Sequence, residues 1–224
     1  RPPVEGHVLH CRAAATDLAP DDLRDFEDAR RGLVASVPEL VVEGPGGAPI
    51  WDMPGYAFVE GEAPDSVHPG LWRQAKLNNI HGLFKVSEGI YQLRGFDLSN
   101  MTLIEGEQGW IVVDPPTARE TAARALAFAR EHLCDGPVSA MIYTHSHVDH
   151  FGGVLGVASA EEIAARGIRV IAPEGFMEEA TSENMLAGTT MGRRAAYMYG
   201  QHLAHAPRGH VDTGLGKGPA FCCF

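Results

Sequence analysis

Long apolar runs are missing from this sequence. The longest uninterrupted apolar stretches, such as Trp110 to Val113, are far shorter than the roughly 20 residues that a membrane-spanning helix needs. We therefore predict no membrane span. The opening residues, RPPVEGHVLHCRAAATD, contain neither an initiator methionine nor an apolar segment of signal-peptide length, so we expect that a start site or leader is missing. Periplasmic, secreted and cytoplasmic locations all stay open.

Basic runs and paired cysteines are also scarce. The net charge is −11 and lysine or arginine never cluster, which argues against a nucleic-acid partner. An anionic substrate would then need a local basic pocket. The cysteines are Cys11, Cys134, Cys222 and Cys223, and their spacing matches neither a zinc ribbon nor a redox motif. We interpret them as ordinary thiols.

Residues 1–80 are predicted to form an arm with one helix that packs on a following domain, of which residues 81–224 form the first part. Apolar side chains recur at helical spacing from Leu23 to Val37, which predicts that helix. The segment EGPGGAPIWDMPGYAF is rich in glycine and proline, which favours an ordered but irregular loop over a strand or a helix.

From Leu83 the pattern changes to short β-rich runs. GLFKV, GIYQLRG, MTLIEG and GWIVVDP alternate with glycine-containing turns, as in antiparallel hairpins. Thr117 and Glu120 form a capping-box signature for a following amphipathic helix, and AMIY then returns the chain to a buried strand. A helix near Val154–Arg166, the strand IRVIAP and helices through Met177–Leu203 complete an α/β (α+β) alternation.

The densest chemical signal is THSHVDHFGG, directly after the AMIY strand. It places His145, His147, Asp149 and His150 within six positions. Imidazole nitrogens and carboxylate oxygens suit zinc and similar divalent ions. The alternating His145 and His147 can converge on one ion, while Asp149 and His150 reach a second. Two ions can lower the pKa of water and supply hydroxide at neutral pH, so the motif predicts hydrolysis.

A strand that ends in Asp114, followed by the THSHVDHFGG strand-loop, resembles the metallo-β-lactamase superfamily, whose fold is an αββα sandwich. The resemblance to alkyl sulfatases within that superfamily is more specific. It rests on GLWRQAKLNNIHGLFKVSEGIYQLRGFDLSNMTLIEGEQGWIVVDP, YTHSHVDHFGGV and RRAAYMYG, and spans roughly residues 50 to 217. These enzymes act on dodecyl sulfate and related esters.

The resemblance implies roles for individual residues. His145 and His147 are expected to bind one zinc ion, and Asp149 and His150 the other, so that a complete site holds two ions and Asp149 belongs to the catalytic centre. Asp114 is expected beside the THSHVDHFGG segment (residues 144–153, the metal loop), where it could orient a ligand. The implied substrate is a small alkyl sulfate.

Similar enzymes continue beyond the region that this chain matches. Their further Glu and His ligands and their sulfate-binding groups come from downstream, before a dimerisation domain and a sterol-carrier-like domain. We therefore expect a sandwich that is incomplete at its C-terminus, and a homodimer in the full-length protein. The final residues, PAFCCF, depart from the family pattern, which suggests truncation, a frameshift or a degenerate gene end.

Two other functions stay open at this point. The metal motif alone specifies water activation but not the ester, so a lactonase or a thioesterase of the same superfamily is an alternative. An inactive truncated fragment is the second alternative, because the downstream ligands are missing from the sequence.

Residues outside the motif carry weaker signals. His202 and His205 are expected on a solvated helix end, and Arg193 and Arg194 on the surface. The stripe from Ala196 to Tyr199 is expected to pack in the core, although an alkyl chain would also need such a wall.

Overall fold

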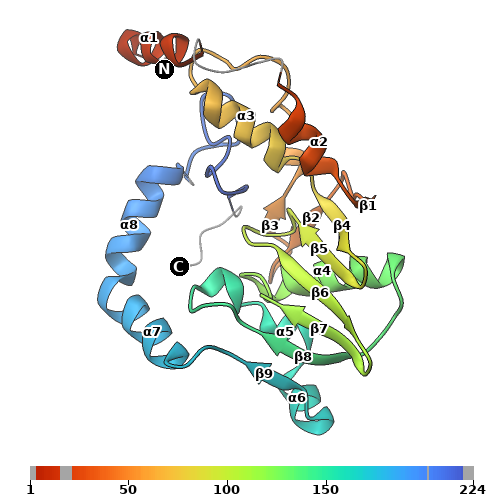
Figure 1. Cartoon of the computed structure of the whole chain (residues 1–224). Coiled ribbons are helices and arrows are strands. Elements are labelled where there is room, and N and C mark those ends of the chain that lie inside the picture. The colour runs from red at the N-terminus through yellow and green to blue at the C-terminus, as the bar shows by residue number, and fades with distance from the viewer. Residues whose placement is uncertain (1–3, 16–21, 201, 219–224) are drawn as a thin grey trace.

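A seven-stranded mixed sheet forms the centre of the molecule (Figure 1). The computed structural model describes residues 4–15, 22–200 and 202–218. Along the sheet the order is β1 (Leu33–Ala35), β4 (Gly82–Ser87), β5 (Ile90–Arg94), β6 (Met101–Gly106), β7 (Gly109–Val113), β8 (Val138–Ile142) and β9 (Arg169–Ile171). The four predicted β-rich runs are therefore strands β4 to β7.

The sheet changes from antiparallel to parallel at β7. Hairpins connect β4 to β7, whereas β7 pairs with β8, and β8 with β9, in parallel. The parallel pairs are connected through helices α4 (Arg119–His132), α5 (Val154–Val157) and α6 (Ala160–Arg166). Because parallel strands end at the same edge, the segments that follow β7 and β8 meet there.

One face of the sheet is buried beneath α4. Alternate residues of the strands, such as Leu103 and Val112, share a core with Ala125 and Leu126 of that helix. The opposite face is only partly covered, since Ile104 and the residues that face it across the strands remain half-buried. A single well-packed layer of helices therefore covers this sheet in the described part of the chain.

The N-terminal region departs from the predicted arm. A helix through Val37 was wrong: α2 (Arg24–Arg30) ends before Gly32, whose φ of +75° turns the chain into strand β1. Such a φ suits glycine because a Cβ would clash. Strand β1 then pairs with β4, across the predicted domain boundary. The boundary itself stays a prediction.

The predicted irregular loop is instead a hairpin. Strand β2 (Val41–Glu43) pairs with β3 (Pro49–Asp52), and both Gly46 and Gly47 adopt positive φ in the connection between them. Gly47 N donates to Gly44 O, so residues 44–47 form a four-residue turn with Pro45 second and the left-handed Gly46 third, the residues that such a turn prefers. The glycine and proline content therefore favours the hairpin rather than excluding it. Trp51 of β3 joins the core under α4. The remaining N-terminal elements are α1 (Glu5–Ala15), the 3₁₀ turn η1 (Pro54–Tyr56) and α3 (Pro69–Asn78).

The amphipathic helix predicted after Thr117 is present as α4, but its capping box was wrong. Thr117 lies before the N-cap and donates its hydroxyl to Asp97 at 2.7 Å, and the N-cap Ala118 offers no side chain. A capping box exists instead on α6, between Ser159 and Glu162. The capping box predicted for α4 is therefore absent there, whereas α6 has one.

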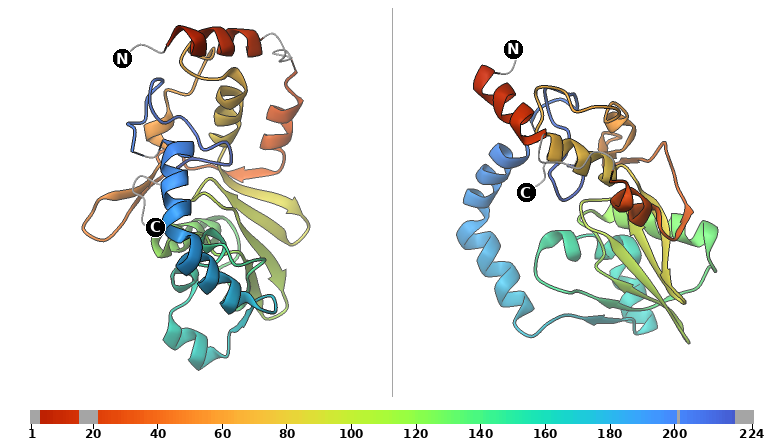
Figure 2. Two further views of the ribbon diagram at one scale, coloured as in Figure 1. Left: turned by 90° about the vertical axis from the view of Figure 1, so that its left-hand side faces the viewer. Right: turned by 45° about the horizontal axis from the view of Figure 1, so that its top comes forward.

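Helices α7 (Phe176–Ser182) and α8 (Gly188–Tyr199) are joined by a π-helical turn, η3 (Glu183–Ala187), into a rod. Figures 1 and 2 show the rod along the flank of the molecule, apart from the strands. Tyr197 is 92% exposed and Met198 is also exposed, so the expectation that Ala196 to Tyr199 pack in the core was wrong. These side chains are exposed because the rod does not pack on the sheet. No described helix is long and apolar enough to cross a membrane.

A second, smaller core joins η1 and α3 to the last described residues. Tyr56, Trp72 and Ala75 pack with Val211, and the ring of His205 stacks on Tyr56 at 4.3 Å. The expectation of a solvated helix end was therefore wrong for His205, although His202 is exposed.

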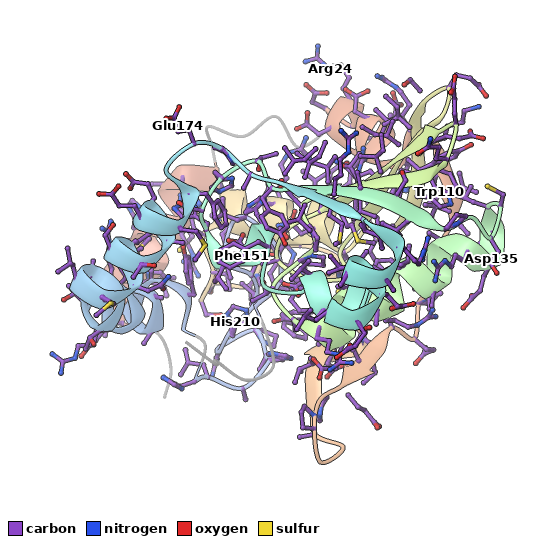
Figure 3. All side chains as sticks on the ribbon, turned by 90° about the horizontal axis from the view of Figure 1, so that it is seen from below. Arg24, Trp110, Asp135, Phe151, Glu174 and His210 are labelled. Atoms are coloured by element: carbon purple, nitrogen blue, oxygen red, sulfur yellow. The ribbon has the colours of Figure 1, made fainter. Side chains whose placement is uncertain are left out.

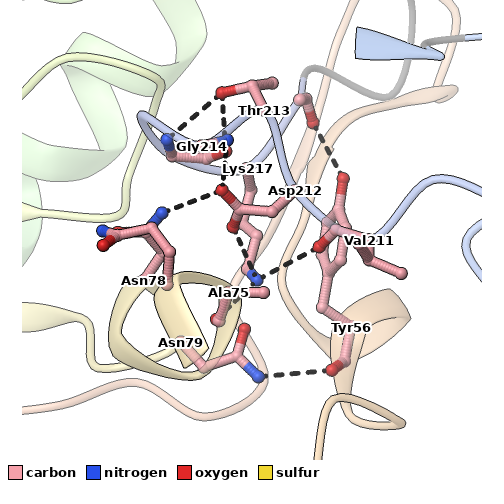
Figure 4. A network of polar contacts seen from close by, with 12 residues as sticks. Tyr56, Ala75, Asn78, Asn79, Val211, Asp212, Thr213, Gly214 and Lys217 are labelled. Atoms are coloured by element: carbon pink, nitrogen blue, oxygen red, sulfur yellow. Dashed lines mark hydrogen bonds and ion pairs between the residues drawn. The ribbon is translucent and has the colours of Figure 1, made fainter. Parts of the chain in front are cut away.

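A buried ion pair lies beside this core (Figure 4). Lys217 and Asp212 approach to 3.0 Å with side chains almost fully inaccessible to solvent. The Lys217 ammonium also donates to Ala75 O at 2.8 Å, and Asp212 accepts from Asn78 at 2.9 Å. Burial lowers the pKa of Lys217, while Asp212 opposes that shift. Each charge thus depends on its partner.

The ion pair gives a first prediction. Lys217→Met should lower the free energy of unfolding by about 3–5 kcal/mol, because it leaves the buried Asp212 carboxylate without its cation. Adding Asp212→Asn should recover part of the loss, since the uncompensated charge is removed. Urea denaturation followed by circular dichroism measures both. The exposed pair of Lys85 with Glu88 supplies the control, and Lys85→Met should change stability little. Equal effects of the two lysine substitutions would contradict the prediction.

The rod gives a second prediction. Met185 and Leu186 are 80% and 86% exposed, and such apolar clusters bind dyes and promote association. We expect the 224-residue chain to enhance the fluorescence of an apolar dye and to self-associate in analytical ultracentrifugation. Replacing both residues by serine should reduce both signals. Val86→Ser, at an exposed position on β4, should leave them unchanged. A monomeric parent chain without dye binding would refute the prediction.

Candidate metal centre

The ends of two parallel strands create the site. Asp114 follows β7 and Thr144 follows β8, and Asp114 N donates to Ile142 O at 2.9 Å, which continues the ladder to the edge of the sheet. Asp114 has a φ of +54° and is the single non-glycine residue with positive φ among those described. Aspartate tolerates this conformation better than most residues. The chain therefore turns sharply where β7 ends, and the acid projects toward the neighbouring loop.

The Asp114 carboxylate binds the metal loop at several points. It accepts from Thr144 N at 2.8 Å and from the Thr144 hydroxyl at 2.7 Å. Its Oδ2 also lies 2.9 Å from Nδ1 of His150. Asp114 is nearly buried, so these contacts replace the water that the carboxylate loses.

His145 and His147 form the first donor pair. Nε2 of His145 lies 3.1 Å from Nδ1 of His147. Two nitrogens that bind one tetrahedral zinc at about 2.0–2.1 Å are roughly 3.3 Å apart, so this spacing suits ligands of a shared ion. The two rings meet edge to face with their centroids 4.7 Å apart.

Asp149 and His150 form the second pair. Oδ2 of Asp149 lies 3.3 Å from Nε2 of His150, again close to the separation of two ligands on one ion. The rings of His145 and His150 are 4.1 Å apart, so the two pairs are neighbours. The structure thus brings together all four residues that the motif singles out. Their metal-binding roles, and that of Asp149 in catalysis, stay predictions.

The donor set fits zinc in chemistry and pairwise spacing, but not in number. Among the described residues, no three histidine, cysteine, aspartate or glutamate side chains gather around one point that could hold an ion. Each pair offers two donors, whereas a catalytic zinc usually takes three from the protein. At least one further donor per ion would be needed to complete either position.

The loop between β5 and β6 contacts the metal loop through residues that the motif did not single out. The Ser99 hydroxyl donates to the carbonyl of Asp149. Asp97 is fully buried and accepts from Thr117 and from the amide of Ala118 at the start of α4. Burial raises the pKa of Asp97, and these hydrogen bonds oppose the shift. No spacing rule marks Asp97 or Ser99, because they act through contacts far along the chain.

Small residues let the metal loop lie against α4. A side chain on Gly153 would come within 2.5 Å of the carbonyl of Pro116, and one on Gly156 within 1.9 Å of that of Arg119. Gly153 N donates to Pro116 O. The glycines after the motif therefore permit close packing of backbones.

The profile of the Metallo-beta-lactamase superfamily matches residues 94–218, which include both strand ends and the whole metal loop. This chain belongs to the metallo-beta-lactamase superfamily. The expected mixed fold of that superfamily is confirmed.

Sulfatases of the superfamily are similar to this chain along most of its length. An alkyl/aryl-sulfatase of Saccharomyces cerevisiae is 46% identical over 91% of this chain and 32% of its own length. A linear primary-alkylsulfatase of Pseudomonas sp. is 48% identical over 91% of this chain and 31% of its own length. The predicted resemblance to alkyl sulfatases is confirmed, and the chain spans about a third of the length of these relatives.

A solved structure gives the same result in three dimensions. The stereoselective inverting sec-alkylsulfatase of Pseudomonas sp. superposes with a TM-score of 0.90 at 41% identity, over 98% of this chain and 34% of that one. The superposition covers nearly every residue of this chain, so the rod and the second core belong to the shared part of the fold.

The contacts of Asp114 give a third prediction. Asp114→Asn should weaken zinc binding by roughly 10-fold or more, because the amide cannot both accept from Thr144 and orient His150. It should also reduce the free energy of unfolding by about 1–3 kcal/mol. Isothermal titration calorimetry and urea denaturation measure the two effects. Glu107→Gln, in the exposed turn between β6 and β7, is the matched control. Unchanged zinc affinity in Asp114→Asn would show that Asp114 does not orient a ligand.

Proposed function

We propose that this chain carries the first metal-ligand motif of a zinc-dependent hydrolase of alkyl sulfate esters, which releases sulfate and an alcohol. The observation that supports it most is the arrangement of two adjacent donor pairs at ligand spacing. The chain that carries them is 45–48% identical, over most of its length, to two alkylsulfatases and an alkyl/aryl-sulfatase. The two donor pairs suggest hydrolysis by metal-activated water, and the relatives suggest that the substrate is a sulfate ester.

Each motif residue has a distinct task in this proposal. His145 and His147 would hold one ion and Asp149 and His150 the other, while Asp114 binds Nδ1 of His150 and leaves Nε2 of that ring free for an ion. Ions bound there lower the pKa of water and neutralise charge on the oxygen that leaves. The Ser99 hydroxyl, bonded to the Asp149 carbonyl, fixes the loop that carries these ligands.

An apolar groove next to the motif suits an alkyl chain. Its volume is about 550 Å³, and its lining includes Tyr143, Val170, Pro173, Phe176 and Met177. The ring of Phe151 lies 5.9 Å from that of Tyr143 and 5.1 Å from that of Phe176. Figure 3 shows Phe151 on the side of the sheet toward the rod. Because Tyr143 and Phe151 flank the metal loop in sequence, a sulfate held at the loop would leave its alkyl chain near this wall.

The number of donors favours a second proposal for the chain by itself. With two protein donors per ion, the ions are neither held at a fixed separation nor shielded from solvent, so a water molecule is not positioned against the ester. We infer that the 224-residue chain binds zinc loosely and turns over little substrate until the rest of the donors is supplied. A homodimer of the full-length protein stays a prediction.

A chimera tests the proposed function. The chain would be fused to the C-terminal two thirds of the Pseudomonas linear primary-alkylsulfatase. We expect the chimera to bind two zinc ions tightly by calorimetry and to release sulfate from dodecyl sulfate, with far less turnover of a lactone or a thioester. His147→Ala should abolish turnover, because it removes one of few ligands and with it the ion.

The controls separate the possible failures. The 224-residue chain alone should bind zinc weakly and release little sulfate. Tight binding of two ions with turnover by that chain would contradict the inference that its donor set is incomplete. A folded chimera that prefers the lactone or the thioester would contradict the sulfatase proposal while leaving the metal site intact. Arg169→Gln, at an exposed position of β9, should have no effect on turnover.

A further inference from the structure

In each histidine of the motif, one ring nitrogen lies at ligand spacing from its paired donor. The three histidines differ in the partner of the other ring nitrogen. Nδ1 of His150 lies 2.9 Å from Asp114, and Nδ1 of His145 lies 2.9 Å from the hydroxyl of Thr144. Both contacts come from the ends of the strands. Nε2 of His147 has no partner within hydrogen-bond distance in the described part of the chain. The sheet therefore orients two of the rings and leaves the third.

The group that approaches the third ring is Glu183. Its Oε1 lies 3.5 Å from Nε2 of His147, which is within ion-pair range but longer than a hydrogen bond. The side chain of Glu183 is 28% exposed. Two residues further along, Met185 is 80% exposed. Glu183 is therefore turned inward from the rod toward the metal loop.

The turn that carries Glu183 is unusual. Residues Glu183–Ala187 form a π-helical turn between two α-helices, and isolated π turns are frequent at functional sites. Side chains satisfy carbonyls at the junction, since Asn184 donates to Ala180 O at 2.7 Å and Ser182 to Glu179 O at 3.2 Å. The turn is thus supported by its own sequence rather than being a frayed helix end.

We propose that Glu183 is a positioning residue of the metal centre, whose carboxylate accepts the Nε2–H of His147. This inference rests on the proposed function, because it assumes that His147 binds zinc through Nδ1. Neutral imidazole carries one proton, so a proton held on Nε2 leaves the Nδ1 lone pair free for the ion. Nδ1 is also the nitrogen that lies 3.1 Å from Nε2 of His145, at ligand spacing.

The chemistry of histidine ligands supports the same assignment. A histidine that binds zinc usually donates its other N–H to a carboxylate or carbonyl, which fixes both the tautomer and the ring. A charge-assisted bond of this kind is about 2.7–2.9 Å long. The Glu183 carboxylate would need to close by roughly 0.7 Å, which rotation of this partly exposed side chain allows. The three histidines would then each have an oriented ring.

The test measures zinc binding and the proton on His147 in the 224-residue chain. Glu183→Ala should weaken zinc binding roughly 10-fold or more in calorimetry. Glu183→Gln should fall between this variant and the parent, because an amide oxygen still accepts the Nε2–H. Glu178→Gln, an exposed acid on the same rod, is the matched control and should bind zinc like the parent.

A spectroscopic signal separates positioning from general stability. In the zinc-loaded chain with ¹⁵N-labelled histidine, Nε2–H of His147 should give a slowly exchanging NMR signal, assigned by its loss in His147→Ala. The signal should disappear in Glu183→Ala and persist, shifted, in Glu183→Gln. A substitution that only loosened the rod would lower the free energy of unfolding without this pattern.

The outcomes for the two proposals differ. If His147→Ala weakens zinc binding but Glu183→Ala changes neither the affinity nor the signal, Glu183 does not position His147 and the proposed metal site stands. If His147→Ala leaves zinc binding unchanged, the metal site itself is wrong, and the role of Glu183 is overturned with it. Weakening by both substitutions together with the expected NMR pattern supports both proposals.

Discussion

The carboxylate of Asp114 is the constraint on which the site depends. It lies at the edge where two parallel strands end, and it binds the backbone and hydroxyl of Thr144 as well as the ring of His150. A single buried acid therefore fixes both the start and the end of the metal loop. The unusual φ of Asp114 is the local cost of aiming that acid across the strand ends. Residues at the strand ends therefore orient His145 and His150, two of the three histidines of the motif.

The grouping of the motif side chains could be predicted from the sequence because they lie in one short segment. His145, His147 and Asp149 are close in space since they are close in the chain, and the preceding strand determines where the loop emerges. Strands β4 to β7 were predictable for a similar reason, as each is a local run and glycine-containing turns separate them. The likeness to alkyl sulfatases supports the proposed substrate class, which no spacing rule contains.

Contacts made over long distances in the chain could not be predicted in this way. Asp97 draws Thr117 away from the expected capping box, and Tyr56 buries His205 from 149 residues away. The stripe at Ala196 to Tyr199 has the composition of a core, yet the rod that carries it stands apart from the sheet. Glu183 likewise approaches the metal loop through tertiary structure alone. In each case a non-local contact outweighs the local pattern.

The buried lysine near the end of the described chain has a consequence for biosynthesis. The ammonium of Lys217 binds the carbonyl of Ala75 across 142 residues of sequence. A ribosome adds about 5–20 residues per second, so on the order of ten seconds separates the emergence of the two partners. During that interval α3 lacks the Lys217 ammonium that binds Ala75 O and the Asp212 carboxylate that accepts from Asn78 Nδ2, while the sheet can already form from local hairpins. The order of synthesis therefore favours a nascent chain in which the sheet and the metal loop form first. The second core around η1 and α3, with its buried ion pair, forms last.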